Sequence, residues 1–380
     1  MKNLTSNIYV LGAGFSAFSG LPLGKDIFSL VIEESKKFDL YGILERDIEN
    51  FLIYYNDNNK EPIDQNEINF EEFLSYLDIQ DFLGLEDTSD YSRRTQNIIR
   101  NLIGRILYLK QKQIKENDFL LYEYFIENID NTDVIITFNY DTIVERCLEK
   151  MNKPFRLFNE RFIGYDYQSL GKVYDKKIRE VILLKMHGSI DWFDIGNFYN
   201  NLKKMANKNN FGLPKHPIFR NEEIFTPEKI ISGPCYENSP LNRIYRVKNL
   251  YEYYDRKNVL FSPLIISPSL NKIVNLNPLI EFWESFYYAG LANKKIVFIG
   301  FSLPKHDDYI RHPFYYMVKN FQESDALPPG RRDRMKMIDY RKNDKEISEF
   351  KDTYSFVDWN KTDCHFDGFN EEAIKFIFEK

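Results

Sequence analysis

Five short apolar runs, flanked by turn residues, constrain this chain more than any other feature of its sequence. They lie at 7–12, 133–138, 180–188, 263–268 and 295–301. The runs are rich in β-branched residues, and their apolarity is continuous rather than alternating, which is typical of strands buried on both faces of a parallel sheet. A weaker run at 354–359 is expected to add another strand. The chain is therefore predicted to have an α/β fold, with a Rossmann-like parallel sheet flanked by helices.

Residues 31–130 lie between the first two runs and have the period of amphipathic helices. One apolar stripe consists of Ile98, Leu102, Ile106 and Leu109, and another of Leu44, Ile48 and Leu52. We therefore predict a large helical insertion or module here. A further helix is predicted at 141–151, where Thr142 and Glu145 have the spacing of a capping box.

These patterns divide the chain into three parts. Residues 1–30, 131–195 and 260–380 together are predicted to form the Rossmann-like domain, and 31–130 the helical module. Residues 196–259 are rich in Asn, Lys and Pro, and we expect an irregular insertion that makes oligomer or partner contacts. Plain elaboration of core and surface is the alternative for both insertions.

A second irregular stretch, at 327–346, carries a basic cluster. The cluster consists of Arg331, Arg332, Arg334 and Lys336. Its partner is left open between nucleic acid, protein and solvent, and solvent is the commonest fate of such a run.

The overall charge indicates no general attraction to polyanions. The 380 residues carry a formal net charge of -6, so direct binding of nucleic acid is not indicated. No apolar run approaches the roughly 18 residues of a membrane span, and residues 1–6 lack the pattern of a signal peptide. We therefore expect a cytoplasmic protein without a membrane partner.

The three cysteines are far apart in the sequence. Cys147, Cys235 and Cys364 form no C-x-x-C pair, so neither a zinc ribbon nor a disulfide framework is expected.

The first run leads into a glycine turn, Gly12-Ala13-Gly14-Phe15-Ser16-Ala17. A G-x-G-x-x-G/A turn between a strand and a helix is the context in which a backbone approaches the pyrophosphate of a dinucleotide. A turn that is structural only is the alternative. The acidic residue that would bind a ribose is not clear, because Glu33 and Glu34 lie in a helical pattern rather than at a strand end.

Polar residues also follow the second run, in the sequence TFNYD. Ligands of open α/β sheets lie outside the carboxyl ends of the strands, so Asn139 and Asp141 are predicted to project into the same crevice as the glycine turn. Helix capping is the alternative role for both side chains.

Two more apolar runs end in residues suited to chemistry. His187, in KMHG, is a candidate general base because the ordinary pKa of histidine lies near working pH, although a structural histidine is the alternative. Gly300 and Ser302, in IGFS, are suited to close contact with a ribose or phosphate, and an ordinary turn is the alternative.

The order of these motifs resembles that of sirtuins. G-A-G-x-S-x-x-S-G-[IL]-P is followed by T-x-N-x-D, then H-G, then G-[FYT]-S, over roughly 300 residues. The matching residues are Gly12, Ala13, Gly14, Ser16, Ser19, Gly20, Leu21, Pro22, Thr137, Asn139, Asp141, His187, Gly188, Gly300 and Ser302. The chain looks like the divergent bacterial branch of this family.

Two departures separate the chain from sirtuin deacylases. The region after H-G has only Cys235 where deacylases carry a zinc ribbon of two C-x-x-C pairs. The first motif continues as LGKD, at 23–26, where deacylases have DFR. In both respects the chain resembles the sirtuin-like domains of bacterial anti-phage systems, which hydrolyse NAD.

The resemblance implies a role for each motif. Asn139 would position the water or the ribose hydroxyls, Asp141 would orient the nicotinamide side, and His187 would act as the base. The cofactor-binding residues would be Gly12, Ala13, Gly14, Phe15, Ser16, Ser19, Thr137, Gly300 and Ser302. NAD would be the substrate, and no metal would be required.

The resemblance also implies a gated enzyme that depletes NAD and aborts infection. We expect a homo-oligomer with a separately encoded sensor or activator, a HerA-type ATPase first, because the chain contains no P-loop. A protein deacylase or ADP-ribosyltransferase is the second hypothesis. A catalytically silent module that senses NAD or ADP-ribose, or serves as a scaffold, is the third.

Overall fold

The computed structural model describes most of the chain. The described residues are 6–85, 89–160, 162–166, 171–174, 178–196, 206–207, 212, 225–231, 240–254, 262–283, 286–304, 307–327 and 330–378. Cys235 and much of the predicted insertion at 196–259 lie outside them.

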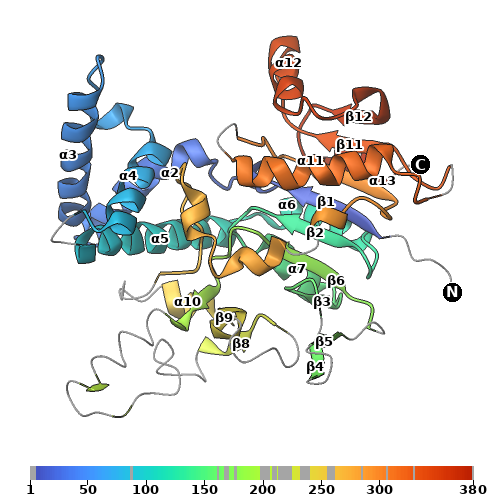
Figure 1. Ribbon diagram of the computed structural model, residues 1–380, viewed down its shortest axis with the longest axis horizontal. Helices are drawn as coiled ribbons and strands as arrows, with labels where there is room; N and C mark the ends of the chain where they lie inside the picture. The colour runs from blue at the N-terminus through green and yellow to red at the C-terminus, as the bar shows by residue number, and fades with distance from the viewer. Residues whose placement is uncertain are drawn as a thin grey trace.

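A sheet of seven parallel strands forms the centre of the fold (Figure 1). Its strands are β1 (Asn7–Leu11), β2 (Val134–Thr137), β3 (Phe155–Arg156), β6 (Val181–Lys185), β10 (Lys295–Ile299), β11 (Met335–Ile338) and β12 (Thr362–His365). The spatial order is β12-β11-β10-β1-β2-β6-β3, and every pairing is parallel. Without the edge strand β3, this is the doubly wound Rossmann order, and the winding reverses between β1 and β10. The α/β prediction is confirmed.

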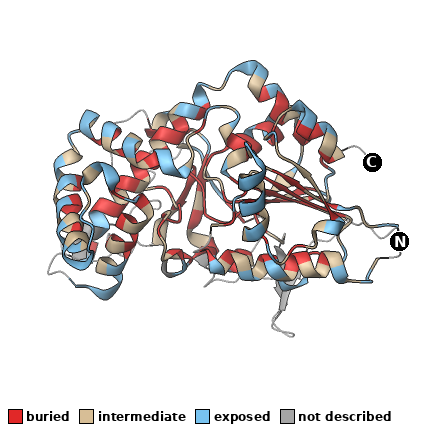
Figure 2. Cartoon of the chain, turned by 90° about the horizontal axis from the view of Figure 1, so that it is seen from above, coloured by how far each residue is buried: buried red, intermediate tan, exposed pale blue. Residues whose placement is uncertain are grey.

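Continuous apolarity gives continuous burial in the central strands. All five residues of β10 are buried, and in β1 only Asn7 is partly exposed. Figure 2 shows the buried strands between helices whose outward faces are exposed. Helices cover both faces of the sheet, so neither face needs polar side chains.

α-Helices make up a large share of the remaining described chain. They are α1 (Ala13–Ala17), α2 (Gly24–Lys37), α3 (Tyr41–Asn58), α4 (Phe70–Leu83), α5 (Ser89–Lys112), α6 (Glu116–Glu127), α7 (Ile143–Lys150), α10 (Leu250–Tyr254), α11 (Asp308–Glu323), α12 (Asp344–Thr353) and α13 (Glu371–Phe378). The long helix α5 contacts α2, α3 and α4, which gather at one end of the molecule (Figure 1). None of the helices in the described part of the chain is long and apolar enough to cross a membrane.

The predicted helical stripes face the core. Ile98, Leu102 and Ile106 are buried in α5, and Leu44 and Ile48 are buried in α3. Leu52 and Leu109 are partly buried and pack against the same core.

Smaller sheets flank the main one. The hairpin of β4 (Phe162–Asp166) and β5 (Gly171–Tyr174) follows β3 along the chain. A second antiparallel sheet has the order β7-β9-β8, with β7 at Trp192–Asp194, β8 at Pro227–Lys229 and β9 at Ile244–Val247. The described part of the predicted insertion at 196–259 therefore contains strands.

Two predicted strands are wrong. The run at 263–268 forms only an isolated bridge, between Ile265 and Gly188, because prolines at both of its ends cannot donate to a ladder. The run at 354–359 is a turn. Its first residue, Tyr354, is fully buried against α12, and Asp358 caps a single 3-10 turn.

Three strands of the main sheet, β3, β11 and β12, were missed by the apolar pattern. β11 lies inside the stretch predicted to be irregular, because Lys336 interrupts its apolar positions. Three residues of the basic cluster bind the protein itself. Arg332 donates to the carbonyls of Phe321, Ser324 and Leu291, Arg334 pairs with Asp363, and Lys336 donates to the Phe376 carbonyl.

The predicted capping box at the start of α7 is also wrong. The Thr142 hydroxyl lies 3.2 Å from Gln111 Oε1, and Glu145 pairs with the buried Lys185. Asp141 caps instead, because its Oδ1 accepts from the backbone N–H of Ile143 at 3.0 Å.

The glycines after β1 and β10 let two turns touch through their backbones. A Cβ on Gly12 would lie 2.4 Å from the Gly300 carbonyl oxygen, and one on Gly300 would lie 2.4 Å from the Gly14 Cα. The N–H of Gly14 donates to the Gly300 carbonyl at 2.9 Å. Gly300 also has a φ of 60°, which favours glycine. These glycines therefore pack two strand ends together.

We predict that Gly300→Ala destabilises the protein by more than about 2 kcal/mol, because the new methyl group overlaps backbone that cannot move and the positive φ disfavours alanine. Urea unfolding followed by circular dichroism measures the change. Gly42→Ala, in α3, is the control, since a Cβ there meets nothing within 4 Å. Equal stabilities of the two variants would contradict the packing role.

Candidate functional site

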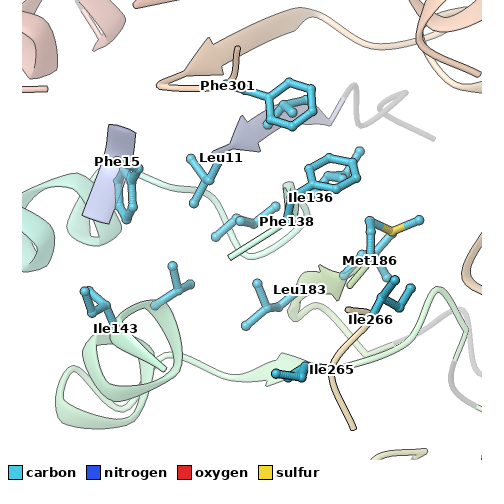
Figure 3. Packing of buried hydrophobic residues seen from close by; sticks show 14 of the residues in the cluster. Leu11, Phe15, Ile136, Phe138, Ile143, Leu183, Met186, Ile265, Ile266 and Phe301 are labelled. Atoms are coloured by element: carbon cyan, nitrogen blue, oxygen red, sulfur yellow. The ribbon is translucent and has the colours of Figure 1, made fainter. Parts of the chain in front are cut away.

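A pocket of about 260 Å³ opens where the carboxyl ends of β1, β2, β6 and β10 meet. It therefore lies beside the reversal point of the sheet, where ligands of doubly wound folds bind. Its apolar wall includes Phe138 and Phe301, whose rings stack with centroids 4.6 Å apart next to Leu11 and Ile136 (Figure 3).

Three polar side chains form a connected group on one wall of the pocket. The Asn139 amide donates to the Gly12 carbonyl at 2.8 Å and to the Ser16 hydroxyl at 3.0 Å. The Ser16 hydroxyl donates to Asp141 Oδ2 at 2.7 Å. The first and second motifs of the sequence are thus joined by hydrogen bonds, and the orientation of Asn139 is set from two sides.

A buried lysine binds the backbone carbonyl of Asp141. Lys185, with no exposed surface, donates to the Asp141 carbonyl and pairs with Glu145 at 2.8 Å. Burial raises the pKa of Glu145, and the nearby Lys185 charge opposes that rise. Both carboxylate oxygens of Asp141 accept hydrogen bonds, one from Ser16 and one from Ile143, so the side chain has little freedom to turn.

His187 is fixed by both its backbone and its ring. Its carbonyl accepts from the Ile266 N–H at 2.8 Å, its ring contacts Phe138 edge to face, and its Nε2 lies 2.5 Å from the Tyr309 hydroxyl. Burial, together with the Lys272 charge, lowers the pKa of His187 from 6.5 to about 3. The imidazole is therefore neutral at working pH and has a lone pair that can accept a proton.

The pocket is also lined by an ion pair that the sequence did not reveal. Lys272 Nζ lies 2.7 Å from Asp307 Oδ1, and both side chains are buried and line the pocket. Glu71 of α4 also lines it. The pocket is thus walled by segments distant in sequence from the glycine turn.

Most of the predicted site residues meet at this pocket. Those that line it are Gly12, Ala13, Ser16, Asn139, Asp141, His187, Gly300 and Ser302. The remaining four, Gly14, Phe15, Ser19 and Thr137, do not line it. Their roles as cofactor-binding residues stay predictions.

These four residues have structural contacts that account for their places. Gly14 packs against Gly300, and Phe15 is buried among aromatic rings. The Ser19 hydroxyl donates to the Ser16 carbonyl at 3.0 Å, and the Thr137 hydroxyl accepts from the Asn139 N–H at 3.1 Å. Thr137 therefore shapes the turn that presents Asn139.

Several pocket residues were missed as site residues. They are Leu21, Pro22, Gly24, Ile27, Glu71, Ile103, Leu107, Phe138, Tyr140, Pro268, Lys272, Phe301, Pro304 and Asp307. Leu21 and Pro22 belong to the first motif, and Phe138 and Tyr140 flank Asn139, so the motifs could have indicated these four. Glu71, Ile103 and Lys272 lie on elements that only tertiary packing brings to the pocket.

The described residues contain no group of three or more His, Cys, Asp or Glu side chains placed to hold a metal ion. Cys147 is buried and Cys364 is half-buried, and both are free thiols. Burial raises the pKa of both thiols above the ordinary value, so neither has the character of a reactive cysteine.

The lowered pKa of His187 predicts a pH-dependent stability. The unfolded chain binds a proton at the ordinary pKa of 6.5 and the folded chain only near 3, so the His187 contribution is complete above 6.5 and is lost as the pH falls toward 3. His187→Gln removes this titration. We expect the gap in unfolding free energy between wild type and variant to narrow by roughly 2 kcal/mol from about pH 7.5 to about pH 5.

Urea unfolding at the two pH values measures this gap. His312→Gln, at an exposed position on α11, is the matched control for the loss of an imidazole. A gap for His187→Gln that stays constant between the two pH values would contradict the lowered pKa of His187.

A comparison with known families gives a match that covers both the second and the third motif of the sequence. Residues 133–213 match the SIR2-like domain, a segment that includes β2, Asn139, Asp141, β6 and His187. A search of curated proteins found no match. The match supports a sirtuin-like family for this part of the chain and is consistent with an NAD-related activity.

Proposed function

We propose that this protein hydrolyses NAD to nicotinamide and ADP-ribose. The observation that carries the proposal is the meeting of Asn139, Asp141 and His187 with the glycine turn in one pocket at the reversal point of the sheet. The match of residues 133–213 to the SIR2-like domain supports NAD as the substrate. NAD is consumed in this reaction and is not a recycled cofactor.

The side chains of the pocket support a hydrolytic mechanism. The bond between C1′ of the ribose and the nicotinamide nitrogen breaks, its electron pair stays with nicotinamide, and C1′ gains oxocarbenium character. A water oxygen then bonds to C1′. His187 is the proposed acceptor of the proton that the water loses, a role that is typically worth about 10²–10⁴ in rate.

In this proposal, Asn139 and Asp141 act because their polar groups are held in fixed positions. The Asn139 amide is held by Gly12 and Ser16, so its oxygen has a set direction for a water or a ribose hydroxyl. Asp141 has a fixed carboxylate, which favours positive charge near the nicotinamide end. Close backbone packing at Gly12 and Gly300 lets the dinucleotide approach the sheet edge.

We further propose that the enzyme is a gated effector of anti-phage defence. Free hydrolysis of NAD harms the cell, so activity must depend on a signal. The proposal includes homo-oligomers and a separately encoded sensor, with a HerA-type ATPase first by the resemblance. Residues 31–130 and 196–259 are the proposed surfaces for these contacts.

We expect Asn139→Ala and His187→Ala each to abolish hydrolysis while the protein remains folded, because each removes one group of the reacting site. Purified protein is incubated with NAD, with and without an acetylated peptide, and nicotinamide and ADP-ribose are followed by chromatography. Cellular NAD on co-expression with neighbouring genes measures the same activity when a partner is required.

Matched controls separate chemistry from stability. Asn56→Ala removes two hydrogen bonds to Ile63 far from the pocket, and His312→Ala removes an exposed imidazole. Both should keep wild-type activity. Turnover that depends on the peptide and yields O-acetyl-ADP-ribose would replace hydrolysis by deacylation, and near-normal activity of either site variant would remove its assigned role.

A further inference from the structure

The pocket carries more negative than positive charge. The charged side chains among its described lining residues are Glu71, Asp141, Lys272 and Asp307, so three carboxylates accompany one lysine and the formal sum is -2. A pocket with this balance favours a ligand group that is cationic or that donates hydrogen bonds.

The three carboxylates differ in how far the protein already uses them. Both oxygens of Asp141 accept hydrogen bonds, and Asp307 pairs with Lys272 at 2.7 Å. No residue in the described part of the chain donates to the Glu71 carboxylate, and its oxygens are not among the fully buried atoms that lack a partner. The half-buried Glu71 therefore offers the carboxylate that a ligand can bond directly.

The backbone of Glu71 is fixed at the pocket by the start of α4. The Asn69 side chain caps the helix and accepts from the Glu71 N–H at 2.9 Å, and the Glu71 carbonyl accepts from the Ser75 hydroxyl at 2.6 Å. The Ser75 oxygen in turn accepts from the Leu270 N–H at 2.7 Å. These contacts join α4 to segment 268–272, which also lines the pocket.

The charge of Glu71 acts on the surroundings of His187. The His187 ring has its centroid 6.2 Å from that of Tyr140, and its Nε2 lies 2.5 Å from the Tyr309 hydroxyl. Burial raises the pKa of both tyrosines, and the charges of Asp307 and Glu71 add to the rise. Glu71 is therefore close to the place where the proposed reaction breaks the bond to nicotinamide.

A carboxylate at this place distinguishes two kinds of dinucleotide. The nicotinamide ring of NAD is cationic, and its carboxamide N–H₂ group can donate to a carboxylate oxygen. The nicotinic acid analogue has a carboxylate instead of the carboxamide, so it loses this hydrogen bond and adds a repulsion between like charges. One residue can thus both attract the correct ligand and reject its analogue.

We propose that Glu71 is a specificity-determining residue that accepts a hydrogen bond from the nicotinamide carboxamide and excludes dinucleotides with a carboxylate in its place. The inference rests on the proposed NAD hydrolysis and names the group by which the substrate is selected. It also gives the helical module at 31–130 a direct part in substrate recognition, because α4 belongs to that module.

The kinetic test uses Glu71→Gln, which removes the charge and keeps the size of the side chain. The quantity measured is kcat/KM for NAD divided by kcat/KM for nicotinic acid adenine dinucleotide. We expect the wild type to prefer NAD and this ratio to fall roughly tenfold or more in Glu71→Gln, as expected for one unit charge at close range near a protein surface.

Glu72→Gln is the matched control. Glu72 is the next residue in the same first turn of α4, so its loss has the same effect on the net charge and a similar effect on the helix, but it does not line the pocket. The variant should keep the wild-type ratio. Thermal unfolding checks that both variants are folded.

A second readout does not depend on turnover. Calorimetry measures the binding of nicotinamide mononucleotide and of nicotinic acid mononucleotide to the wild type and to both variants. We expect the wild type to prefer the first ligand and Glu71→Gln to lose roughly tenfold or more of that preference, by the same loss of one unit charge.

The two readouts separate the outcomes. An unchanged preference in Glu71→Gln, an equal change in Glu72→Gln, or no binding of either mononucleotide to the wild type overturns the inference. Equal weakening of both mononucleotides in Glu71→Gln also overturns it, because Glu71 then bonds the ribose that the two ligands share. If the preference changes as expected but the wild type never hydrolyses NAD, even with its neighbouring genes, the proposed function fails and the role of Glu71 is supported.

Discussion

The close backbone contact between the turn after β1 and the turn after β10 is the constraint on which the site depends. Gly12, Gly14 and Gly300 bring these turns within a distance that a single methyl group would prevent. The contact lies at the reversal point of the sheet, where no helix crosses over and a crevice is left. The exposed side chain of Ser302 in the turn after β10 lines the pocket, whereas the Ser16 hydroxyl is held by Asp141 and Asn139.

Buried charged side chains fix the positions of polar groups around the pocket. Lys185 donates to the Asp141 carbonyl, and Lys272 pairs with Asp307 at the start of α11. Buried pairs of this kind contribute little net stability compared with apolar residues, but breaking one is costly. Such pairs keep the groups that they contact in fixed positions. Lys272 also acts on His187, whose pKa is lowered by burial and by the Lys272 charge.

Local patterns predicted the strands that are buried on both faces and the helices with a wide apolar stripe. β1, β2, β6 and β10 were found because central strands of a parallel sheet have no polar face. β11 was missed because Lys336 lies beside α13 and reaches the Phe376 carbonyl, so a basic residue is satisfied inside a strand. The run at 263–268 has the composition of a strand, but its prolines and its contact with Gly188 leave it as a single bridge.

The sequence by itself determined which polar residues follow the central strands, and therefore that Asn139, Asp141 and His187 would share one edge of the sheet. This follows from topology alone, since parallel strands end on the same side. The tertiary structure decided what surrounds them. Lys272 and Tyr309 reach the site through packing between segments far apart in the chain, and no local period or motif records which nitrogen of His187 such a neighbour will occupy.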